Sequence, residues 1–87
     1  MNTNLTIYCN QNPKEYQLGS CSWHCNDEIW ESALRIVSNI LGHPIRDTSW
    51  NGENYRHYST NLFKLKPNQF ESILKKLSYE GITFSIF

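Results

Sequence analysis

The beginning of the chain alternates apolar and polar side chains with the period of a β-strand. In residues 5–9 (LTIYC), Leu, Ile and Cys share one face, and Tyr8 lies on the other face with Thr. Residues 15–23 (EYQLGSCSW) contain further strand-forming types, and the turn formers of 10–13 (NQNP) precede them. We therefore expect a first strand over 5–9 and a second strand that pairs back on it as a hairpin, with Gly19 at a bulge.

Two longer segments follow the 3.6-residue period of an amphipathic helix. Residues 26–41 carry a wide apolar face, begin with Asn26 as a good N-cap and are followed by Gly42, a common residue type just past a helix. Residues 67–80 begin with proline, present an apolar stripe at i, i+3, i+4 and i+7, and precede Gly81. These features predict two helices that each bury one face against a core.

The dipeptide Asn51-Gly52 lies between the two predicted helices, in a segment rich in strand-forming aromatic residues. Asn-Gly is a strong signal for a β-hairpin, because both central residues of a type I′ turn need a positive φ. We therefore expect a hairpin with this turn at its tip. The chain ends on residues 82–87 (ITFSIF), which carry bulky side chains on both faces and predict a strand at the centre of the sheet or under a cover.

The resulting order of elements, β-(β)-α-β-β-α-β, predicts one α+β domain over residues 1–87. Helices that cover one face of a mainly antiparallel sheet are the economical way to bury the apolar side of each element. We expect a two-layer sandwich of four or five strands with two helices on one face. If the second strand is left out, the order is that of a ferredoxin-like fold.

Composition and charge argue against some functional classes and favour others. The chain has 87 residues, with eight basic and eight acidic side chains, and this balance argues against an acidic DNA mimic and against a protein that binds duplex DNA mainly by charge. Without a signal peptide or a membrane-length apolar run, we expect a cytoplasmic protein with reduced cysteines and no membrane partner. Ten asparagines suggest an A/T-rich genome, such as that of a phage or mobile element.

The three cysteines and a nearby histidine allow three interpretations. Cys9, Cys21, His24 and Cys25 are enough donors for a tetrahedral zinc ion, although their spacing is unusual for a zinc site. Alternatively, Cys25 precedes a helix N-terminus, where the helix dipole favours a nucleophilic thiolate, and His43 or His57 is then its base. The third interpretation, which we favour, makes Cys21 and Cys25 small buried residues, with no cofactor.

The predicted hairpin carries the best candidates for a binding surface: Trp50, Tyr55, Arg56, His57 and Tyr58. Trp, Tyr and Arg dominate binding hot spots, and five such side chains in nine residues exceed what one small core can bury. The sequence therefore favours a non-catalytic module that docks on a larger protein and inhibits it, as immunity proteins, antitoxins and phage counter-defence proteins do. The alternatives are a single-stranded RNA or DNA-binding domain that stacks bases on sheet aromatics, and a cysteine-dependent or zinc-binding protein. An exposed edge strand would also allow a homodimer.

Overall fold

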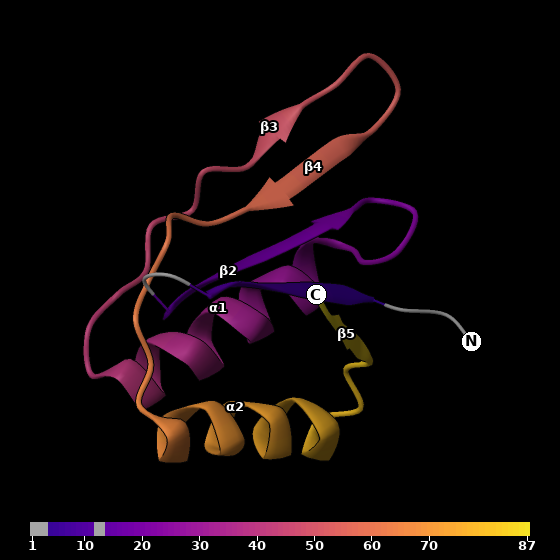
Figure 1. Ribbon diagram of the computed structural model, residues 1–87. Helices are drawn as coiled ribbons and strands as arrows, with labels where there is room; N and C mark the ends of the chain where they lie inside the picture. The colour runs from indigo at the N-terminus through magenta and orange to yellow at the C-terminus, as the bar shows by residue number, and fades with distance from the viewer. Residues whose placement is uncertain (1–3, 12–13) are drawn as a thin grey trace.

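The computed structural model describes residues 4–11 and 14–87 and has the predicted α+β architecture (Figure 1). Five strands form one sheet in the order β3-β4-β2-β1-β5, and both helices lie on the same side of it. Only the β1–β5 pair is parallel among the described strand pairs. The elements are β1 (Leu5–Gln11), β2 (Lys14–Cys21), α1 (Asp27–Leu41), β3 (Trp50–Asn51), β4 (Arg56–Ser59), α2 (Pro67–Tyr79) and β5 (Phe84–Ile86).

The first two strands form the predicted hairpin, so the sheet has five strands and the four-stranded alternative does not apply. Cα partners run in continuous register from Thr6 opposite Gly19 to Gln11 opposite Lys14. Gly19 also pairs with Ser59 of β4, and the predicted bulge at this glycine is therefore wrong. Residues 12 and 13 of the predicted loop lie outside the described residues.

One face of the sheet packs against both helices and forms the core. Trp30 of α1 is 1% exposed, and its ring lies 5.2 Å from the ring of Tyr58 on β4. Truncating such a buried aromatic side chain to alanine costs about 3–5 kcal/mol, so this contact ties α1 firmly to the sheet. The buried apolar side chains are Leu5, Ile7, Tyr16, Leu18, Cys25, Trp30, Ala33, Ile36, Val37, Tyr58, Phe63, Ile73, Leu77 and Ile82.

The helix boundaries agree with the capping signals in the sequence. The side chain of Asn26 accepts a hydrogen bond from the backbone N–H of Ile29 at 2.9 Å, as expected of an N-cap. Gly42 ends α1 with a φ of 83°, and Gly81 follows α2 with a φ of 76°. Both glycines adopt the left-handed conformation that other residues reach only at a cost, which explains why the helices end there.

Two predictions about the other strands are wrong. The Asn51-Gly52 segment does lie in a hairpin, but Gly42 and Gly81 are the only described residues with positive φ, so the turn is not type I′. The backbone N–H of Gly52 donates to the carbonyl of Tyr55 instead, which moves the tip of the turn toward residues 53 and 54. The C-terminal strand β5 lies at an edge of the sheet, because it pairs with β1 alone, and it is not covered, because Ile86 is 48% exposed.

Candidate binding surface

The face of the sheet that points away from the helices, called here the open face, has no helix over it in the described part of the chain (Figure 1). Successive residues of a strand point to opposite faces, so the strand register determines which side chains lie here. Because Ile7 and Leu18 face the core, their neighbours in each strand face outward. The outward side chains include Asn10 and Glu15 near the β1–β2 turn, and Thr6, Tyr8, Gln17, Cys21, Trp50, His57 and Ser59.

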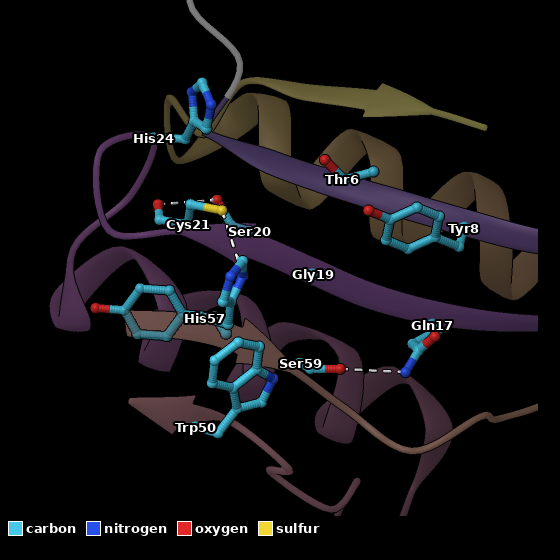
Figure 2. A pocket seen from close by; sticks show the side chains of 11 residues that line it. Thr6, Tyr8, Gln17, Gly19, Ser20, Cys21, His24, Trp50, His57 and Ser59 are labelled. Atoms are coloured by element: carbon cyan, nitrogen blue, oxygen red, sulfur yellow. Dashed lines mark hydrogen bonds between the residues drawn. The ribbon is translucent and has the colours of Figure 1, made fainter. Parts of the chain in front are cut away.

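A hollow of about 360 Å³ lies on this face, with Gly19 of the central strand β2 among its lining residues (Figure 2). A Cβ atom at Gly19 would come within 3.1 Å of Cε2 of Tyr8 and 3.4 Å of the carbonyl oxygen of Tyr58. The missing side chain therefore allows the Tyr8 ring to lie across β2 and leaves the middle of the face concave. Glycine inside a strand commonly marks a position where a ligand or another chain comes close.

Side-chain rings surround the hollow and form what we call the aromatic rim. On one side, the centroids of the Trp50 and His57 rings lie 4.2 Å apart, and the Tyr55 ring is nearly perpendicular to His57 at a centroid distance of 4.7 Å. Trp23 extends this row with a contact of 4.8 Å to Tyr55. On the β1 side, the ring of Tyr8 stacks on that of the C-terminal Phe87 at 6.2 Å. The rim consists of Tyr8, Trp23, Trp50, Tyr55, His57 and Phe87.

Four rim residues are exposed although their side chains are large and aromatic, whereas Tyr55 and His57 are half-buried. Tyr8 is 48% exposed, Trp50 54%, Trp23 62% and Phe87 73%. None of the described residues that line the hollow is Asp, Glu, Lys or Arg. The hollow therefore combines rings with neutral polar groups, which is the composition of the core of a protein–protein interface rather than of its charged surroundings.

The structure divides the five predicted hairpin residues between the two faces of the sheet. Trp50, Tyr55 and His57 belong to the aromatic rim, whereas Arg56 and Tyr58 point toward α1. The expectation that Tyr58 lies at the surface is wrong, because this residue is 4% exposed and belongs to the core. Alternation along β4 makes this division unavoidable, since neighbouring residues of a strand cannot share one face.

Arg56 and Tyr58 both bind one carboxylate oxygen at the start of α1. Oδ1 of Asp27 accepts a hydrogen bond from the Tyr58 hydroxyl at 2.7 Å and an ionic hydrogen bond from Nη1 of Arg56 at 3.0 Å. The guanidinium carbon of Arg56 lies 5.0 Å from the centroid of the Tyr58 ring. Burial and the neighbouring Asp27 raise the pKa of Tyr58 to about 12. These contacts attach β4 to α1 and give Arg56 a structural role.

The three cysteines are free thiols in three different environments. Cys9 packs against the core at the far end of β1, and Cys25 is buried, where desolvation raises the pKa of its thiol. Cys21 is half-buried on the open face, and its Sγ lies 3.4 Å from Nδ1 of His57. Cys25 therefore lacks the exposure and the favourable environment of a nucleophile.

The proposed zinc donors are not gathered into one site. Cys25 faces the core, whereas Cys21 and His24 line the hollow, and Cys9 lies toward the other end of the sheet. Among the residues that the structure describes, no three His, Cys, Asp or Glu side chains lie close enough together to hold a metal ion.

Sequence reasoning missed four residues of this surface: Tyr8, Gly19, Trp23 and Phe87. The alternation in residues 5–9 places Tyr8 opposite the apolar face, and this pattern was sufficient to identify it. Phe87 carries no such signal, because only the parallel pairing of β5 with β1 brings it beside Tyr8.

Comparison with known proteins identifies no relative of this chain. No family model, no curated protein and no solved structure matches the chain. None of the described helices is long and apolar enough to cross a membrane.

Proposed function

We propose that this protein is a non-catalytic binding module that docks on a larger protein through the open face of its sheet and inhibits that protein. The observation that carries the proposal is the exposed aromatic rim around a neutral hollow. Large exposed aromatic side chains are costly to leave in water and supply most of the energy at protein interfaces. Small inhibitors such as immunity proteins, antitoxins and phage counter-defence proteins act by covering a surface of their target, and they need no chemistry of their own.

Charge favours a protein over a single-stranded nucleic acid as the partner. A surface that binds single strands combines stacking rings with lysine or arginine side chains along the phosphate path. The hollow has no such side chain among its described lining residues, and Arg56 is held against Asp27 on the opposite face. Four of the lysines, Lys64, Lys66, Lys75 and Lys76, lie in α2 and the segment before it.

The free thiols support the location that the proposal assumes. All three cysteines are unpaired, and a reducing compartment such as the cytoplasm keeps thiols in this state. We include a cytoplasmic location in the proposal for this reason.

The experiment compares capture of the target by wild-type protein and by variants of the open face. Trp50→Ala and Tyr8→Ala remove two rim side chains, and Tyr79→Ala removes an aromatic side chain that is 88% exposed on α2 and serves as the matched control. We expect the wild type and Tyr79→Ala to retain the same protein from the source organism, and Trp50→Ala to retain at least about tenfold less of it. This result supports the proposal, since a hot-spot residue contributes about 2 kcal/mol or more.

Inhibition is tested on the captured protein itself. Its activity, measured with increasing amounts of wild-type chain, should fall, and Trp50→Ala should require about tenfold more protein for the same effect. Equal capture by all variants would contradict docking through the open face. Retardation of single-stranded RNA at low salt, weakening steeply as salt is added, would replace the proposal with the nucleic-acid alternative.

A further inference from the structure

The hollow on the open face contains a thiol and an imidazole in direct contact (Figure 2). Sγ of Cys21, the last residue of β2, lies 3.4 Å from Nδ1 of His57 on the neighbouring strand β4. The two residues are Cα partners in the sheet register, so the strand pairing itself holds them together. When Nδ1 carries no proton, it can accept the thiol proton from Cys21.

Two aromatic rings pack against the imidazole. The Trp50 ring lies 4.2 Å from the His57 ring, centroid to centroid, at an interplanar angle of 35°, and the Tyr55 ring lies 4.7 Å from it at 83°. Trp50 is also the Cα partner of His57 in the β3–β4 pair. These contacts limit rotation of the imidazole and keep Nδ1 directed at the sulfur.

Cys21 differs from the other two thiols in its exposure to the hollow. Cys21 lines the hollow, which has room for a small molecule beside the sulfur. Cys25 is 4% exposed in the core, and Cys9 packs against the core. Reactive cysteines are partly exposed and have a neighbouring base or cation, and Cys21 combines these features.

We propose that Cys21 is a thiol modification site, at which low-molecular-weight disulfides such as glutathione disulfide form a mixed disulfide with the help of His57. In this reaction Nδ1 of His57 takes the thiol proton, and Sγ attacks one sulfur of the disulfide. A new S–S bond joins Cys21 to one half of the reagent, and the original S–S bond breaks. The other half leaves as a thiolate and takes up the proton from the imidazolium, so Cys21 is oxidised and the reagent is reduced.

An adduct on Cys21 occupies the hollow, so modification and docking exclude each other. This consequence rests on the proposed function. The thiol reaction is measured on the isolated chain, and it succeeds or fails independently of any partner.

The test follows the intact mass of the full chain during incubation with glutathione disulfide. We expect a single adduct, located on Cys21 by peptide mapping, that is absent in Cys21→Ser and unchanged in Cys9→Ser and Cys25→Ser. His57→Gln should slow the reaction about tenfold, because it removes the base that takes the thiol proton. Circular dichroism verifies that each variant is folded.

A second measurement separates assistance by His57 from a structural effect of its replacement. The pH profile of the adduct-forming rate should differ in shape between the wild type and folded His57→Gln, because only the wild type has a base beside the thiol. Equal rates for Cys9 and Cys21, or a wild-type pH profile identical to that of folded His57→Gln, would overturn the proposal.

Discussion

Replacing Tyr58 with phenylalanine tests how β4 is attached to α1. The change removes one hydroxyl group and leaves the buried ring in contact with Trp30. The hydroxyl donates a 2.7 Å hydrogen bond to Oδ1 of Asp27, a carboxylate whose side chain is 67% exposed. Hydrogen bonds to charged groups contribute about 1.5–3 kcal/mol, and the water around Asp27 places this one at the low end. We expect Tyr58→Phe to lower the free energy of unfolding by about 1.5 kcal/mol near neutral pH.

The pH dependence of this loss gives the sharper test. Burial, together with Asp27, raises the pKa of Tyr58 to about 12 from its ordinary value of 10.0. Above pH 10 the unfolded tyrosine ionises while the folded one stays protonated, so the contribution of Tyr58 is complete below about pH 10 and is lost as pH rises toward about 12. Each pKa unit of difference between the two states corresponds to about 1.4 kcal/mol. The stability advantage of the wild type over Tyr58→Phe should therefore shrink across this interval.

The assay is urea denaturation of both proteins at pH 7 and at steps between pH 9.5 and about pH 11.5, followed by circular dichroism. Tyr79→Phe is the matched control, because Tyr79 is 88% exposed and its replacement should leave stability within about 0.5 kcal/mol of the wild type. A difference between wild type and Tyr58→Phe that stays constant up to pH 11.5 would refute the reasoning, and so would an equal loss in Tyr79→Phe.

Three further changes test other features of the fold. Asn26→Ala removes the N-cap of α1 and should cost about 1 kcal/mol in urea denaturation. Asp47→Asn should make the protein less sensitive to acid. Burial raises the pKa of the Asp47 carboxyl, but hydrogen bonds, chiefly from Ser49, and the charge of Arg56 together hold it below its ordinary 3.8. Its stabilisation is therefore present above that pH and is lost as pH falls below it. Gly19→Ala should raise the free energy of unfolding by about 0.5–1 kcal/mol through reduced backbone freedom, but the added methyl group displaces the Tyr8 ring. We therefore expect a net change within about 1 kcal/mol, together with a shift of the Tyr8 ring signals in NMR spectra.

Each of these three predictions has an outcome that would contradict it. Unaltered stability in Asn26→Ala would mean that the cap contributes nothing to α1. Acid unfolding curves of equal slope for wild type and Asp47→Asn would show that the hydrogen bonds from Ser49 to Asp47 do not contribute to stability in acid. A loss above about 2 kcal/mol in Gly19→Ala would show that the backbone carbonyl of Tyr58, rather than the exposed Tyr8 ring, resists the added methyl group.

Local features of the sequence determined the elements of this fold. The period of the apolar residues identified both helices, and Asn26, Gly42 and Gly81 marked their ends, because capping and left-handed φ depend on residues within one turn. Alternation identified β1 in the same way. The turn at Asn51-Gly52 was predicted with the wrong geometry, since its backbone is set by how β3 and β4 pair rather than by the dipeptide alone.

The binding surface was decided by tertiary structure. Composition could indicate that some hairpin rings remain outside the core, but only the register of β4 determines that His57 faces outward while Tyr58 packs on Trp30. The neighbours that complete the surface come from distant parts of the chain: β1 brings Tyr8, and the C-terminal residue Phe87 joins it through parallel pairing. Helix periods and caps are short-range properties that a sequence displays directly. The pairing of strands distant in sequence depends on which apolar faces can be buried together, and that is settled only when the whole chain packs.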